Sequence, residues 1–383
     1  MSDSIKQKTI SRRELLRTSL AGAASIPLIS VSAKINAVSA TPMRAAVIER
    51  GGQPIKSNIK LVNNWPSPVA GPGQVVVRTL ASALNHLDLF IAWNPRQTPW
   101  VCGSDACGEI VELGTGVDKA WLGKRVLLNA RVSEASPDLP GVRPPELAPG
   151  KFIGLDMVGT HAERFVAPIS NLIAIEDNID PVQAAAFPLT YLTAWRMLTS
   201  RAKIAPDQTL LLTGIGGGVA SASLDIARHI GCEIIVTSRH QYKLDRARER
   251  GAHHTVLDEG QDWSKEVMVI TGNRGVDVCA DSVAKAVHMR CLNSLALGGT
   301  LVTCGSTTGS DVTTNNNLIF LRQLSYLGSS MGSMEELREV TTLFRRGYLK
   351  PEVDSVFPAD QAADAFDRLE SSKQVGKVVI KWA

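Results

Sequence analysis

The chain has 383 residues, of which 44% are hydrophobic and 20% charged, and this composition excludes intrinsic disorder. Residues 1–40 hold six Lys and Arg against two Asp and Glu, so they carry the whole formal net charge of +4 and the remainder is neutral. A neutral body argues against a nucleic-acid partner, and six cysteines without a CxxC pair argue against a disulfide framework.

The first 40 residues have the features of an export signal. Residues 11–16 have the sequence SRRELL, and an apolar run of small residues follows over 18–31. This pattern resembles the twin-arginine signal of bacteria, and about 14 apolar residues are too few to span a bilayer. We expect a signal peptide over 1–40, cleaved after Ala40 or alternatively after Ala33, and a periplasmic protein without stable membrane insertion. The alternative is an uncleaved leader on a cytoplasmic protein.

The next part of the chain is rich in predicted β-strands. Short β-branched segments separated by Gly and Pro predict strands over 43–50, 74–80, 109–111 and 125–128. Residues 133–150 contain five prolines and predict an irregular loop.

From residue 209 strands and helices alternate. Apolar strands are predicted over 209–213, 233–238, 276–280 and 300–304, with helices over 221–229, 241–250 and 284–297. This alternation predicts an α/β fold with a doubly wound parallel sheet covered on both faces. Helices over 334–346 and 360–369 and a strand over 377–381 end the chain.

Residues 213–220, TGIGGGVA, lie between a predicted strand and a predicted helix. Glycines at such a turn let the backbone approach a pyrophosphate at the helix N-terminus. Val219 takes the sixth place of the usual GxGxxG pattern, so the strand–loop–helix context carries the prediction. The predicted cofactor-binding residues here are Gly214, Gly216, Gly217, Gly218 and Val219, and Gly305 after a later strand is added because parallel sheets bind ligands at that edge.

The end of the second strand of this unit indicates which nicotinamide cofactor is bound. An Asp or Glu there would bind the ribose hydroxyl of NAD, but the chain has Ser238, Arg239 and, one turn later, Lys243. Two cations and a hydroxyl suit the 2′-phosphate of NADP(H). The alternative is that both cations are solvated surface residues.

Several separated motifs occur in the order of a known family: GSDACGEIV over 103–111, GKRV over 123–126, PLTYLTAW over 188–195 and GKVV over 376–379. The chain resembles the medium-chain dehydrogenase/reductase superfamily, and most closely its zinc-free quinone oxidoreductase-like, enoyl reductase-like and alcohol dehydrogenase-like members. The resemblance implies a GroES-like β-rich catalytic domain over 41–189, a Rossmann NADP-binding domain over 190–330 and a segment over 331–383 that completes the catalytic domain. It also implies a homodimer or homotetramer.

The metal positions of that family are altered here. Its catalytic zinc ligands correspond to Asn85, Ser104-Asp105 and Leu189, and residues 129–152 hold no cysteine for a structural zinc. We therefore expect no metal. The alternative is a rebuilt site drawn from His86, Cys102, Asp105 or Asp156, which would permit an alcohol dehydrogenase.

Without a Lewis acid, hydride transfer favours a small-molecule substrate that accepts it unaided, such as a quinone or an α,β-unsaturated carbonyl. The candidate catalytic residues are Asn85, Asp88 and Tyr191, where Asp88 has the alternative role of orienting its loop.

Thr193 is a further predicted cofactor-binding residue, because it resembles the family threonine that touches the nicotinamide. His86 is an alternative proton donor, and Lys377 either approaches the cofactor phosphates or is a surface cation. Ser104 and Asp105 are weaker candidates for the polar role. A non-enzymatic NADPH-binding protein on this scaffold is the remaining alternative.

Overall fold

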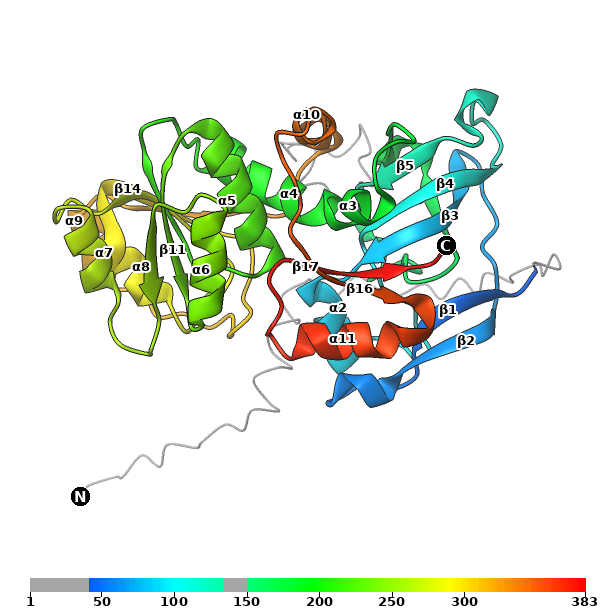
Figure 1. The fold of residues 1–383 in the computed structure, drawn as a ribbon, viewed down its shortest axis with the longest axis horizontal. Coiled ribbons are helices and arrows are strands. Elements are labelled where there is room, and N and C mark those ends of the chain that lie inside the picture. Colours follow the sequence, from blue (N-terminus) through cyan, green and yellow to red (C-terminus); the bar gives the residue numbers. More distant parts are fainter. Residues whose placement is uncertain (1–40, 134–149) are drawn as a thin grey trace, which may run out of the picture. The chain divides into compact units, whose positions relative to one another are not determined.

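The computed structural model describes residues 41–133 and 150–383, and Figure 1 shows its fold. The predicted signal peptide and nearly all of the predicted proline-rich loop lie outside the described residues. Within the described residues no helix is long and apolar enough to cross a membrane.

A six-stranded parallel sheet lies in the second half of the chain. Its strands, in spatial order, are β12 (His254–Leu257), β11 (Glu233–Ser238), β10 (Thr209–Leu212), β13 (Val276–Asp281), β14 (Leu295–Thr303) and β15 (Ser325–Gly328). The sheet is covered by α5 (Gly218–Ile230), α6 (Gln241–Glu249), α7 (Ser264–Ile270) and α8 (His288–Ser294), with α9 (Asn316–Leu321) before β15.

Both faces of this sheet are buried, and β10 shows how. Leu210 and Leu212 belong to the core that includes Leu224 of α5, whereas Leu211 between them belongs to the core that includes Trp263 and Leu292. Successive strand side chains point to opposite faces, so a run of leucines supplies both cores. This is the arrangement that the fully apolar strands predicted.

A second, largely antiparallel sheet is formed by the first part of the chain and its end. Its path is β16 (Val353–Pro358), β17 (Lys377–Lys381), β3 (Gln74–Ala83), β4 (Ala106–Leu113), β5 (Arg125–Leu128) and β9 (Leu172–Ala174), with β8 (Arg164–Pro168) paired to β3. Smaller pairs are β1 (Met43–Ile48) with β2 (Ile59–Trp65) and β6 (Arg131–Ser133) with β7 (Gly150–Phe152).

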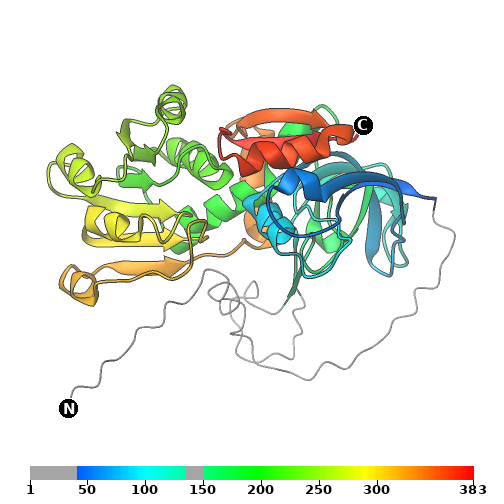
Figure 2. The ribbon, with the colours of Figure 1, turned by 90° about the horizontal axis from the view of Figure 1, so that it is seen from below.

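The end of the chain is built into this second sheet. β17 pairs antiparallel with β3, and α11 (Ala362–Glu370) packs its Phe366 into a core with Ile48 and Ile380. Figure 2 shows α11 (red) beside the blue N-terminal hairpin. The remaining helices are α2 (His86–Trp93), α3 (Pro181–Ala186), α4 (Pro188–Trp195) and α10 (Met334–Arg345), with a π-helical turn over Arg196–Arg201.

The predicted fold class, a GroES-like β-rich part with a Rossmann-type parallel sheet, is confirmed. One predicted element is wrong in its extent: the helix expected over 284–297 is confined to His288–Ser294, because β14 begins at Leu295 and pairs with β13. The sequence analysis did not identify α2, which proves central to the site.

Candidate active site

The glycine loop lies between β10 and α5, as predicted. Gly214 and Gly216 have φ values of +63° and +101°, which side chains rarely adopt. A Cβ on Gly216 would lie 2.6 Å from Cδ of Lys243, so the stem of this lysine crosses the loop. A glycine-rich backbone without side chains at the N-terminus of a helix can approach a pyrophosphate closely. Gly217 and Val219 belong to the same turn and are partly buried.

The start of α5 is approached by two other segments. A Cβ on Gly218 would lie 2.9 Å from Cγ2 of Thr190 and 3.1 Å from Cδ of Lys377. The N–H of Gly376 donates to the carbonyl of Gly216 over 2.9 Å. The C-terminal GKVV motif therefore lies directly on the glycine loop.

Lys377 reaches from this loop into a buried polar cluster. Its Nζ donates to Oδ1 of Asn85 over 2.5 Å and to Oδ2 of Asp105 over 2.9 Å. The amide of Asn85 donates to the same Asp105 oxygen over 2.9 Å. Lys377 is 4% exposed and Asp105 is fully buried, so this is an enclosed ion pair. The third N–H of Lys377 has no partner in the described part of the chain.

Asn85 and Asp105 are among the positions that the family resemblance matches to the catalytic zinc ligands, together with Ser104 and Leu189. The other oxygen of Asp105 accepts from the N–H of Leu189 over 2.8 Å, and the hydroxyl of Ser104 donates to the carbonyl of Ile153 over 2.8 Å. An amide, a hydroxyl and a leucine are poor zinc ligands, and the ammonium of Lys377 already supplies a positive charge to Asp105. This residue set does not fit a zinc ion.

Asp88, a predicted catalytic residue, holds the start of α2. Its Oδ2 accepts from the N–H of Asn85 over 2.7 Å, which is the back-bond of a capping box. Burial would raise the pKa of this carboxyl, but His161 and the Asn85 N–H outweigh burial and hold the pKa of Asp88 below its ordinary value. Asp88 is fully buried, and this geometry matches the alternative role of orienting its loop.

His86 is partly exposed at the first position of α2. Burial, followed by the positive charges of Lys377 and Lys243, lowers its pKa. The imidazole is therefore neutral near pH 7, and it can donate one hydrogen bond more readily than it can release a proton.

The predicted 2′-phosphate residues follow β11. Arg239 is exposed and forms no hydrogen bond or ion pair within the described residues, which leaves its guanidinium free for a ligand. The ammonium of Lys243 instead donates to the carbonyl of Ser372 over 2.7 Å. Burial and then the neighbouring Arg239 lower the pKa of Lys243 to about 8. Ser238 is buried and its Oγ accepts from the N–H of His240.

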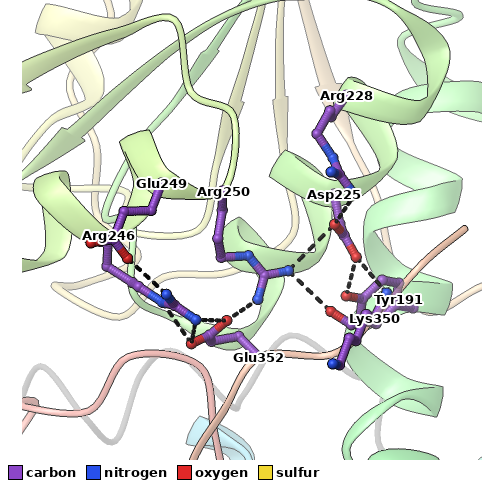
Figure 3. Close-up of polar contacts among 8 residues, drawn as sticks. All are labelled: Tyr191, Asp225, Arg228, Arg246, Glu249, Arg250, Lys350 and Glu352. Carbon is purple, nitrogen blue, oxygen red and sulfur yellow. Dashed lines mark hydrogen bonds and ion pairs between the residues drawn. The ribbon is translucent and has the colours of Figure 1, made fainter.

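The structure directs Tyr191 away from this site. Its hydroxyl donates to Oδ2 of Asp225 over 2.9 Å, its ring stacks on Phe187, and it is 2% exposed. Burial, with the charge of Asp225, raises its pKa well above the ordinary value. Tyr191 thus belongs to a separate polar network that extends from the interior to the surface, which Figure 3 shows with Arg228, Arg246, Glu249, Arg250, Lys350 and Glu352.

Two predicted cofactor residues lie elsewhere on the elements named above. Thr193 donates its hydroxyl to the carbonyl of Leu189 within α4, so Thr190 is the α4 residue against the glycine loop. Gly305 is exposed just after β14. The sequence analysis gave Lys377 no preferred role and did not mention His161, since neither lies in a pattern that signals its contacts.

Comparison with known proteins shows which family the chain resembles in sequence and in structure. Residues 71–177 match the alcohol dehydrogenase GroES-like domain, and residues 218–346 match the zinc-binding dehydrogenase family. The crystal structure of an NAD-dependent alcohol dehydrogenase is 34% identical, with a TM-score of 0.83 over 89% of this chain and 100% of that one.

Two curated relatives extend the comparison. The zinc-type alcohol dehydrogenase-like protein YogA of Leptosphaeria maculans is 29% identical over 87% of this chain and 96% of its own length. A 2-haloacrylate reductase of a Burkholderia species is 28% identical over 88% of this chain and 98% of its own length.

Proposed function

Because the chain belongs to the medium-chain dehydrogenase/reductase superfamily, we propose that it is an NADPH-dependent reductase of quinones or α,β-unsaturated carbonyls that uses no catalytic zinc. The observation that carries the proposal is the enclosed Asn85–Asp105–Lys377 cluster. A protein cation and its counter-ion lie among the residues that the family resemblance matches to the zinc ligands, and this supports a reaction in which no metal polarises a carbonyl or holds an alkoxide.

The substrate class follows from that difference. A simple ketone accepts a hydride more readily when a Lewis acid polarises its carbonyl, whereas a quinone or an enone spreads the incoming charge by conjugation onto oxygen. The similarity to a 2-haloacrylate reductase supports an activated carbon–carbon double bond as the acceptor.

The chain's own residues divide the remaining tasks. Bound NADPH supplies the hydride. The glycine loop holds the cofactor phosphates, because an anion there meets the N-terminus of α5. Arg239 binds the 2′-phosphate. His86, partly exposed and neutral, donates a hydrogen bond to the substrate oxygen.

The test is a substrate panel with purified mature protein. NADPH oxidation is followed with quinones, enones and 2-haloacrylate, and with matched saturated ketones that lack only the conjugation. We expect turnover of the conjugated compounds at least about tenfold faster than of their saturated partners, which is about 1.4 kcal/mol in the barrier. Equal rates for both sets, or NADPH binding without turnover of any of them, would reject the proposal.

We also propose that the protein is exported through the twin-arginine route. Support comes from the SRRELL motif, the short apolar run and the confinement of the net charge to residues 1–40. This route carries folded proteins, so a tightly bound cofactor could travel with the chain. N-terminal sequencing of protein from fractionated cells tests the idea. A mature start near Thr41 in the periplasmic fraction supports export, and an intact N-terminus in the cytosol contradicts it.

A further inference from the structure

A second buried cluster lies behind the candidate site. It consists of Asp88 from α2, Cys102 from the segment before β4 and His161 from the segment before β8. One potential ligand atom of each residue lies within 4.8 Å of the other two, and all three residues are fully buried. Three separate segments of the chain thus bring a carboxylate, a thiol and an imidazole close together.

Two of these atoms lack a hydrogen-bond partner among the described residues. Oδ1 of Asp88 and Nε2 of His161 are buried and form no hydrogen bond with any described residue. They lie 3.7 Å apart, which is too far for a hydrogen bond. A buried carboxylate oxygen without a partner is costly, so a native protein that keeps one requires an explanation.

The opposite ends of the same side chains are well held. Oδ2 of Asp88 accepts from the N–H of Asn85 over 2.7 Å. Nδ1 of His161 lies 2.9 Å from Oγ of Ser82, and this Oγ accepts from Nε1 of Trp382 over 2.9 Å. Such outer partners orient metal ligands and fix the tautomer of a ligating histidine.

We propose that Asp88, Cys102 and His161 bind one structural divalent cation of zinc-like softness. The three donors suit zinc, whose usual ligands are thiolate, imidazole and carboxylate. The charges also balance, because Cys102 loses its proton on binding and the thiolate, the carboxylate and the dication sum to zero. The bound ion satisfies Oδ1 of Asp88 and Nε2 of His161 at once.

This ion has no part in the proposed hydride transfer. Its ligands are enclosed, and they are distinct from the Asn85–Asp105–Lys377 cluster of the candidate active site. The ion joins α2 to two loops, and through Asp88 it fixes the backbone of Asn85. The site also differs from the rebuilt catalytic site considered from the sequence, since of His86, Cys102, Asp105 and Asp156 it includes only Cys102.

The test uses the full chain produced in cells grown with cobalt or zinc, because an enclosed site is loaded as the protein folds. We expect about one ion per chain by elemental analysis and, for cobalt, a thiolate-to-metal charge-transfer band. Cys102→Ser should remove the band and lower the metal content at least about tenfold. Cys107→Ser is the matched control, since Cys107 is equally buried five residues away but lies outside the cluster.

His161→Gln provides an independent variant in case Cys102→Ser fails to fold. It keeps the thiol, so a cobalt band that survives in folded His161→Gln protein contradicts the proposed ligand set. A folded wild-type chain with less than about a tenth of an ion after growth in either metal overturns the proposal, as does cobalt without a thiolate band. In those cases the thiol and the imidazole merely surround a buried carboxylate.

Discussion

Two buried polar clusters meet at the start of α2, and they differ in how their buried polar atoms are paired. In the Asn85–Asp105–Lys377 cluster the charges are paired and each oxygen of Asp105 has a donor. In the Asp88–Cys102–His161 cluster one oxygen and one nitrogen face each other without a hydrogen bond. Burial alone therefore says little about function. The carboxylate of the first cluster is fully paired without a ligand, and we propose that a ligand pairs the carboxylate of the second.

Disrupting the Asn85–Asp105–Lys377 cluster should have the largest effect on stability. Lys377→Met leaves the buried Asp105 carboxylate without its counter-ion, and such a loss costs about 3–5 kcal/mol of unfolding free energy. NADPH binding should weaken as well, because disruption of the cluster disturbs the start of β17, where the N–H of Gly376 donates to the carbonyl of Gly216 in the glycine loop. Urea denaturation and cofactor titration measure the two effects.

The control for this prediction is Lys381→Met, which removes an exposed lysine from the same strand, β17. Adding Asp105→Asn to Lys377→Met removes the buried carboxylate that has lost its counter-ion. The double variant should therefore be more stable than Lys377→Met alone. If Lys377→Met unfolds like the control, the cluster is not an enclosed ion pair.

Binding of a metal ion to the Asp88–Cys102–His161 cluster should have the next largest effect on stability. A ligand that binds only the folded chain at 100 times its dissociation constant adds about 2.7 kcal/mol of stability. Chain folded with zinc should therefore melt at a higher temperature than metal-free chain, and His161→Gln should melt at the same temperature with or without zinc. Calorimetry measures both, and a zinc-dependent shift that persists in His161→Gln would place the ion elsewhere.

The two clusters also differ in what the sequence revealed. Apolar runs and glycine positions predicted the parallel sheet and the phosphate loop, because period-2 burial and tight turns depend on neighbouring residues. Position within the family motif identified Asn85. The contacts of Lys377 span 292 residues to Asn85 and those of His161 span 79 to Ser82, and no local pattern encodes them. The hydrogen bond from Tyr191 to Asp225 on another helix is likewise not encoded in any local pattern.

Arg239 tests whether an exposed, unpaired cation selects the cofactor. Arg239→Ala should cost about 1.5–3 kcal/mol of NADPH binding, the range for a charge-assisted hydrogen bond, with little change for NADH. Titration of both cofactors measures the difference. Arg248→Ala, an exposed arginine on α6, is the control. Equal losses for NADPH and NADH would refute the assignment of the 2′-phosphate.

Lys243 is intermediate between the two clusters, since its ammonium is largely buried but has one carbonyl partner, and its effect should be the smallest. Burial and Arg239 lower its pKa to about 8, so the ammonium is charged at pH 7 and mostly neutral at pH 9. Between that pKa and the ordinary one the unfolded chain binds the extra proton, so this group makes unfolding less favourable as pH rises.

A 2′-phosphate beside Arg239 favours the charged form of Lys243, so the preference for NADPH over NADH should fall a few-fold, about 1 kcal/mol or less, from pH 7 to pH 9. Lys243→Met should flatten this profile, and an unchanged slope in Lys243→Met would assign the pH dependence to another group.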